Sequence, residues 1–395
     1  MSLVGVAGLL LGLLALSWGM VVRDNRKLGL FVAIIVAHAI TSALYYYYVQ
    51  NSDADTKLYY YDPYGFYSQP FSLGTIFLIY LVQWLKSQIG GSYFDYFLLF
   101  QAIGVWGIVL LARILEELTI VLDEPWPPLL TIMVMMPGMY FWTSAISKDG
   151  PLFFACALAL WATMALSRRW AWMGVAVVLM MLFRPHVALL SMIAFALALV
   201  AGRGVATSVR VMLVGLSAVA VIALAGTVQA SLRIDLSSVG SIASYVDNQS
   251  AVAANASGTG GGIVTLPLPV KLFSLLYRPF FFDAGGIFGL VASVQNIFMV
   301  YATFLLIREF RVWRAMFRES LPIRFATLFL AGMVLMLSVM YYNVGLGLRQ
   351  REMFTPALYL IFCSVYIVKR GQRAVAARDS RLVPDPGNVP DLRRN

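Results

Sequence analysis

The chain has 395 residues, of which 61% are hydrophobic and 12% are charged, and its formal net charge is +10. Soluble domains carry about 25% charged residues, so this composition excludes an ordinary soluble globular protein. The two cysteines, Cys156 and Cys363, both lie within apolar segments. Their positions exclude a disulfide framework and a thiolate metal site.

Apolar segments of about 20 residues recur along the whole chain, and each predicts a membrane-spanning helix. The predicted fold class is therefore all-α, a polytopic integral membrane helix bundle of about eleven transmembrane helices with longer extracytoplasmic loops. No basic residue precedes the first segment and no small-residue cleavage site follows it, so we expect a retained helix rather than a signal peptide. The predicted spans cover residues 2–22, 28–49, 94–115, 128–146, 150–167, 170–185, 187–202, 209–229, 284–307, 325–343 and 353–369.

Two regions are too short for a simple span. Residues 71–85 are apolar and could form a re-entrant or interfacial helix. The segments 170–185 and 187–202 could form a re-entrant pair, with Pro185 breaking the helix between them.

The basic residues predict the orientation, because cytoplasmic segments of membrane proteins are enriched in Lys and Arg. Placing the loop after the first span inside also places most of the 29 basic residues inside. The positive charge is then explained by membrane insertion and predicts no nucleic-acid partner. We expect residues 1–370 to form one transmembrane domain and residues 371–395, with their three prolines, to form a disordered cytoplasmic tail.

The predicted outside face carries the two longer loops, residues 50–93 and 230–283. The second loop contains the glycine-rich stretch Asn255–Gly262. A stretch of this composition predicts a linker or a lid that orders over bound substrate.

The first outside loop contains a pair of carboxylates, Asp53 and Asp55. In an extended segment, side chains at i and i+2 point in the same direction. The pair could share a divalent cation, or one member could act as a general base on a hydroxyl group. Several tyrosines follow, and they could bind a sugar or form an interfacial aromatic belt with solvated carboxylates.

Lys148 and Asp149 are adjacent opposite charges between two apolar segments. We expect a hydrated turn here, because burying such charges in hydrocarbon costs about 3 kcal/mol each. Asp149 could cap the helix that Gly150 and Pro151 open, and Lys148 could add a positive charge to a helix N-terminus that attracts anions. The alternative is a snorkelling lysine paired with its neighbour.

Arg184 and His186 flank Pro185 between two apolar segments without other polar residues nearby. Arg184 could bind a phosphate group in bidentate fashion, and His186 could donate a hydrogen bond or transfer a proton. The alternative is a structural kink whose arginine binds freed carbonyl groups. His38, the other histidine, lies within a span and is expected to be a core residue.

Three further arginines lie on the predicted outside face. Arg278 precedes Pro279 where the second outside loop re-enters the membrane, and Arg349 and Arg351 stand before the last span. Arginines on this face oppose the usual charge distribution. A diphosphate ligand would explain them, and an ion-pair network with outside carboxylates is the competing explanation.

These motifs resemble two groups of membrane glycosyltransferases. A carboxylate-bearing first outside loop and the pattern RQREMFTP (residues 349–356) resemble enzymes of the GT-C type. The segments FWTSAISKDG, LFRPHVALL and LYRPFFFDAGG are more similar to Wzy-type and EpsG-like bacterial polymerases of O-antigen and exopolysaccharide. We expect no soluble C-terminal domain in this chain, in contrast to the large GT-C enzymes.

The resemblance implies a polysaccharide polymerase of the bacterial inner membrane with its active site facing the periplasm. Its substrate would be a polyprenyl-diphosphate-linked glycan, and other polysaccharide-assembly membrane proteins could be partners. The diphosphate would be held by Arg184, Arg278, Arg349 and Arg351, with Lys148 and His186 as further binding residues. One of Asp53, Asp55 and Asp149 would deprotonate the acceptor hydroxyl group. No cofactor is expected apart from a divalent cation that Asp53 and Asp55 could share.

Two alternatives remain at this stage. One is a GT-C transferase that adds a single sugar from a polyprenyl-phosphate donor. The other is a flippase or transporter of the same lipid-linked glycan. A transporter should have charged residues buried in the middle of its spans, whereas the charges here cluster at the outer ends, which favours an enzyme.

Overall fold

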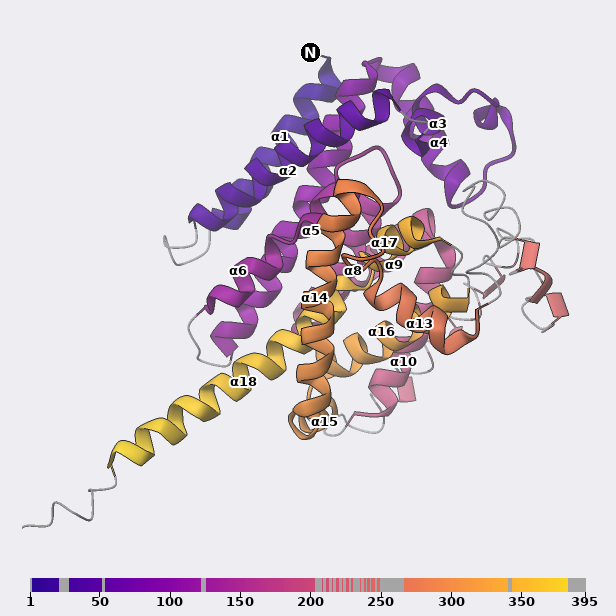
Figure 1. Cartoon of the computed structure of the whole chain (residues 1–395). Helices are drawn as coiled ribbons and strands as arrows, with labels where there is room; N and C mark the ends of the chain where they lie inside the picture. The colour runs from indigo at the N-terminus through magenta and orange to yellow at the C-terminus, as the bar shows by residue number, and fades with distance from the viewer. Residues whose placement is uncertain are drawn as a thin grey trace, which may run out of the picture.

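The computed structural model describes residues 2–20, 28–51, 54–121, 126–202, 266–339 and 343–382, with isolated positions between residues 208 and 248. All regular elements in these ranges are helices, so the predicted all-α class is confirmed for the described residues (Figure 1). The glycine-rich stretch and most of the predicted span 209–229 lie outside the described residues.

The long apolar helices follow the predicted spans closely. Five described helices are long and apolar enough to cross a membrane, or six if the bent pair at the C-terminal end counts as one. This is the architecture of an integral membrane protein, although the number of eleven spans is not confirmed. Elements that correspond to predicted spans include α1 (Leu3–Met20), α2 (Leu28–Gln50), α5 (Tyr93–Val121), α9 (Leu166–Phe183), α14 (Gly286–Arg308) and α16 (Leu321–Val339).

Shorter helices complete the bundle. The two regions that could have formed re-entrant elements are α4 (Thr75–Ile89) and the pair formed by α9 and α10 (Pro185–Val200), in which Pro185 opens the second helix. The others are α3 (Asp55–Tyr61), a short 3₁₀ helix η2 (Phe66–Ser68), α8 (Asp149–Met164), α13 (Leu268–Tyr277) and α15 (Phe310–Glu319).

Two predicted spans are broken in the structure. Residues 128–146 form α6 (Pro128–Val134) and α7 (Pro137–Thr143), because Pro137 has no backbone N–H to continue the first helix. The last span is preceded by α17 (Val344–Arg351), which meets α18 (Thr355–Leu382) at an angle of 61°. Helix α18 also passes the predicted tail boundary at Gly371 and continues to Leu382.

Helix α5 is the central element of the core. It packs against α1, α2, α7 and α8, and its buried side chains are almost all aliphatic or aromatic. A second contact region joins α16 to α10, α13 and α18. The C-terminal part of α18 extends away from the bundle (Figure 1).

Among the described residues, ion pairs between distant elements separate into two groups at opposite helix ends. One group joins the segments that were predicted inside: Arg169 on α9 binds Glu117 on α5 at 2.8 Å, and Lys369 on α18 binds Glu309 after α14 at 3.2 Å. The other group joins the segments predicted outside and is described below. The structure thus supports the predicted pairing of helix ends, and which end faces the periplasm remains a prediction.

Candidate functional site

The candidate site is built around the turn of residues 144–148, between α7 and α8. Asp149 does not cap α8 as the sequence suggested. Lys148 occupies the cap position, and Asp149 is the first helical residue, whose backbone N–H donates to Ser147 Oγ at 3.2 Å. The carboxylate of Asp149 is therefore available for other partners.

Helix α2 and a close approach of α5 hold this turn in place. His38 is fully buried and its Nε2 lies 3.0 Å from Thr143 Oγ1, which confirms its prediction as a core residue. Ser42 Oγ donates to the Ser144 carbonyl at 3.2 Å. On α5, a Cβ atom at Gly104 would lie 2.2 Å from the Thr143 carbonyl oxygen, so only glycine fits there. These contacts hold the backbone that leads into α8, and thereby position Asp149 at the start of that helix.

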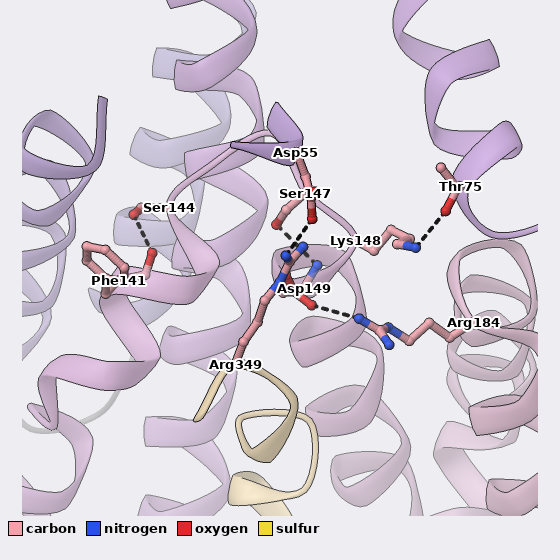
Figure 2. Close-up of polar contacts among 9 residues, drawn as sticks. All are labelled: Asp55, Thr75, Phe141, Ser144, Ser147, Lys148, Asp149, Arg184 and Arg349. Atoms are coloured by element: carbon pink, nitrogen blue, oxygen red, sulfur yellow. Dashed lines mark hydrogen bonds and ion pairs between the residues drawn. The ribbon is translucent and has the colours of Figure 1, made fainter. Parts of the chain in front are cut away.

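Asp149 binds two arginines from different parts of the chain (Figure 2). Its Oδ1 accepts from Arg184 Nη2 at 3.2 Å, and its Oδ2 accepts a short hydrogen bond from Arg349 Nε. Arg349 Nη1 also donates to Asp55 Oδ2 at 2.7 Å. We call Asp55, Lys148, Asp149, Arg184 and Arg349 the charge cluster. It joins α3, the start of α8, the junction of α9 and α10, and α17.

Lys148 extends the charge cluster toward α4. Its Nζ donates to Thr75 Oγ1 at 2.8 Å, while Asp149 points to the arginines (Figure 2). The start of α4 is held against the end of α9, because the Gly74 N–H donates to the Leu182 carbonyl at 2.9 Å. Lys148 is thus not simply paired with its neighbour, and Thr75 is a site residue that the sequence analysis missed.

The two carboxylates of the cluster differ in accessibility. The Asp149 side chain is 3% exposed and both of its oxygens accept charge-assisted hydrogen bonds from arginines. The Asp55 side chain is 56% exposed and uses one oxygen on Arg349. An engaged, buried carboxylate is suited to positioning arginines, whereas an exposed one can accept a proton from a substrate.

The cations of the cluster retain binding capacity. With Lys148 protonated, Asp55 and Asp149 together balance two of the three positive charges on Lys148, Arg184 and Arg349, which leaves a net charge of +1. Arg184 Nε is buried and has no hydrogen-bond partner within the described part of the protein. Buried polar atoms are normally paired, so this donor is suited to an anionic ligand. His186 lies in the first turn of α10, within the electrostatic range of Arg184 and Lys148.

Two of the predicted arginines lie apart from the charge cluster. Arg278 binds Asp283 in its own turn. Arg351 is fully buried, and its Nη1 donates to the Leu276 carbonyl at 2.9 Å, which ties α17 to α13. The structure therefore brings Arg184 and Arg349 together, and it does not bring Arg278 or Arg351 into contact with them.

The remaining candidate, Asp53, lies outside the described residues, so the structure does not place the predicted Asp53–Asp55 pair. Within the ranges described, no group of three or more His, Cys, Asp and Glu side chains is arranged to hold a metal ion.

Buried aromatic side chains pack near the charge cluster. Tyr45 on α2 packs edge-on against Phe141 with ring centroids 4.6 Å apart, and Phe141 packs against Trp142 at 5.0 Å. Tyr45 and Tyr59 also lie within the electrostatic range of Arg349, Asp149 and Asp55. Of the tyrosines predicted to bind a sugar, Tyr59 lies near the charge cluster but is buried, so sugar binding stays a prediction. The proximity of Tyr45 was not foreseen from the sequence.

The fold and the charge cluster define a helical membrane protein with a polar centre at one end of its bundle. No protein-family model matches the chain, and no curated protein or solved structure is significantly similar to it. The functional argument therefore depends on the residues themselves.

Proposed function

We propose that this protein is a membrane glycosyltransferase that polymerises polyprenyl-diphosphate-linked oligosaccharide units on the periplasmic face of a bacterial inner membrane. The observation that carries the proposal is the charge cluster. Three cations from separate elements converge beside an exposed carboxylate, Asp55, and an excess positive charge remains. A lipid-linked diphosphate supplies the matching negative charge.

Each member of the charge cluster has a role in this reaction. Arg184 and Arg349 bind the diphosphate, and Asp149 keeps both guanidinium groups in position. Lys148 adds a third cation, and the developing charge of the leaving group is stabilised by groups already in place. His186 donates a hydrogen bond to the same ligand.

The chemical step is glycosyl transfer. Asp55 takes the proton of the acceptor hydroxyl group, and the hydroxyl oxygen forms a bond to the anomeric carbon of the donor sugar. The bond between that carbon and the diphosphate oxygen breaks, and its electron pair leaves with the polyprenyl diphosphate. The products are the extended glycan and the free lipid diphosphate, so no redox partner is required.

The test replaces each arginine by lysine, which keeps the charge but loses the planar fork that binds phosphate in bidentate fashion. We expect Arg184→Lys and Arg349→Lys to insert normally and to lose about 100-fold or more in glycan product, as is typical when one such donor is removed. The matched control is Arg168→Lys, an exposed arginine at the opposite end of the bundle. The measurement is glycan length and amount on a gel, in cells that lack the native gene.

Protein level by immunoblot separates catalysis from folding. Full-length polymer from both variants, or loss of the protein itself, would contradict a role of these arginines in substrate binding. If the wild-type protein lengthens the product by one sugar only, the result would favour a single-addition transferase with a polyprenyl-phosphate donor over a polymerase.

A second candidate function is the flippase or transporter of a lipid-linked glycan. It is favoured by charges inside the bundle, because Glu352 is buried and its Oε1 accepts from Gln295 Nε2 of α14 at 3.0 Å. Arg351 is buried beside it. Transport of a labelled lipid-linked oligosaccharide across reconstituted vesicles, abolished by Glu352→Gln, would support this function over the transferase.

A further inference from the structure

A second basic site lies at the opposite end of the bundle from the charge cluster, between α14 and α18. A cavity of about 170 Å³ is lined there by two helical stripes that face each other. Spacings of three and four residues place side chains on one helix face. The stripes consist of Tyr301, Phe304, Leu305 and Arg308 on α14 and Tyr366, Lys369, Arg370 and Arg373 on α18.

The cavity carries more positive charge than its one neighbouring carboxylate balances. Glu309 binds both Arg308 and Lys369, each at 3.2 Å. Arg370 and Arg373 form no ion pair with any described residue. The four cations and Glu309 therefore leave a net charge of +3, which favours a phosphate-bearing ligand.

The other half of the cavity is apolar and aromatic. Tyr301, Phe304, Leu305 and Tyr366 lie one to two turns deeper along the same two helices. A free phosphate ion would leave these side chains without a contact, whereas the first carbons of a lipid chain would cover them. The combination of a basic rim and an apolar floor matches a phospholipid.

The neighbouring helix α15 supports a location at the membrane surface. Arg311, Arg314 and Arg318 lie on one face of this helix, and Phe310 and Trp313 pack together on another with ring centroids 5.1 Å apart. None of its ten residues is buried in the protein. Trp313 packs partly against the hydrophobic core and its Nε1 donates to Thr327 Oγ1 at 3.3 Å, whereas the three arginines are exposed. The exposed basic face of α15 is therefore the side that can meet anionic lipid headgroups.

We propose that the cavity between α14 and α18 binds the headgroup of an anionic phospholipid, with Arg370 and Arg373 as its phosphate ligands. This site is separate from the charge cluster and does not depend on the proposed glycosyl transfer. It anchors the end of α14 and the start of the protruding part of α18 to the lipid surface.

The test measures phosphatidylglycerol binding to the purified full-length protein by native mass spectrometry. The variant is the double substitution Arg370→Gln/Arg373→Gln. The matched control is Arg168→Glu, which changes the net charge by the same two units at an exposed site on the same predicted face. We expect the double variant to bind phosphatidylglycerol about 30-fold more weakly than the control, since each basic residue near a membrane surface contributes about 1 kcal/mol.

Two further probes identify the source of the phosphate. Phosphatidylcholine should bind wild type and double variant equally, because its headgroup has no net charge. Equal phosphatidylglycerol binding by the double variant and the control would overturn the proposal. It would also be overturned if inorganic phosphate alone bound the wild type as tightly as phosphatidylglycerol and lost that binding in the double variant, since the ligand would then be a soluble anion.

Discussion

Lys148 is the residue of the charge cluster whose protonation should respond to pH near neutrality. It lies in the turn between α7 and α8, outside the apolar helices. Burial, together with the nearby Arg184 and Arg349, lowers the pKa of Lys148 from 10.5 to about 7. Between pH 7 and 10.5 the folded protein therefore binds fewer protons here than the unfolded chain, and this residue makes the free energy of unfolding rise with pH over that window.

The protonation state of Lys148 should also govern anion binding at the charge cluster, because only the protonated side chain carries a positive charge. We expect the affinity of the protein for pyrophosphate to fall by about tenfold between pH 6 and pH 8.5, as Lys148 loses its charge and with it a charge-assisted hydrogen bond. Lys148→Met should bind weakly at both pH values. Isothermal titration calorimetry on both proteins provides the measurement, and the difference between them removes the effect of pyrophosphate's own titration. An identical pH dependence in the two proteins would contradict the role of Lys148.

The sequence identified most members of the charge cluster because isolated charges between apolar segments mark helix ends. It could not separate Arg349 from Arg351, since the helical state of residues 344–351 was not foreseen. Residues two apart on an α-helix are separated by about 200° of rotation around the helix axis, so their side chains lie on nearly opposite faces. One of the two arginines therefore reaches Asp149, and the other turns into the protein toward Leu276. Arg278 lies apart from the charge cluster and pairs with Asp283, five residues further along the same turn.

At the scale of elements, the contact between α5 and the turn after α7 depends on one glycine. Replacing Gly104 by alanine would place a methyl group 2.2 Å from the Thr143 carbonyl oxygen and 2.9 Å from His38 Nε2. Overpacking of this kind costs about 1–3 kcal/mol. We therefore expect Gly104→Ala to lower the midpoint of thermal unfolding in detergent and to reduce glycan product.

Helix α9 offers the matched control for this substitution. A methyl group added at Gly174 would meet no neighbouring side chain or distant backbone atom within 4 Å. Gly174→Ala should therefore leave stability unchanged or raise it by up to about 1 kcal/mol through helix propensity. Equal unfolding midpoints for Gly104→Ala and Gly174→Ala would show that α5 does not constrain the turn.

The positions of the apolar helices were predicted from the sequence, whereas the breaks within them were not. Hydrophobicity locates apolar segments, so α2, α5 and α14 agree with the predicted spans. It does not detect a change of direction within an apolar segment. The break before Pro137 and the 61° bend between α17 and α18 were therefore missed, although both bring polar residues toward the interior.

For the whole molecule, the central prediction is its orientation in the membrane. Both native cysteines are buried, so a cysteine introduced at an exposed position should be the main reactive thiol. We expect a membrane-impermeant maleimide applied from the periplasmic side to label Asn51→Cys and not Arg168→Cys, since these exposed residues lie at opposite ends of the bundle. Mass spectrometry of the labelled protein gives the result, and the reverse pattern would place the charge cluster in the cytoplasm.

The order in which the ribosome makes the chain gives the charge cluster a further consequence. Arg349 follows Asp149 by 200 residues and Asp55 by 294 residues. At about 5–20 residues per second, about 15–60 s of synthesis separate Asp55 from its arginine. Asp149 is made before both of its partners, Arg184 and Arg349. The bundle therefore enters the membrane with its central carboxylate incompletely neutralised, and the last helices to be inserted close the assembly.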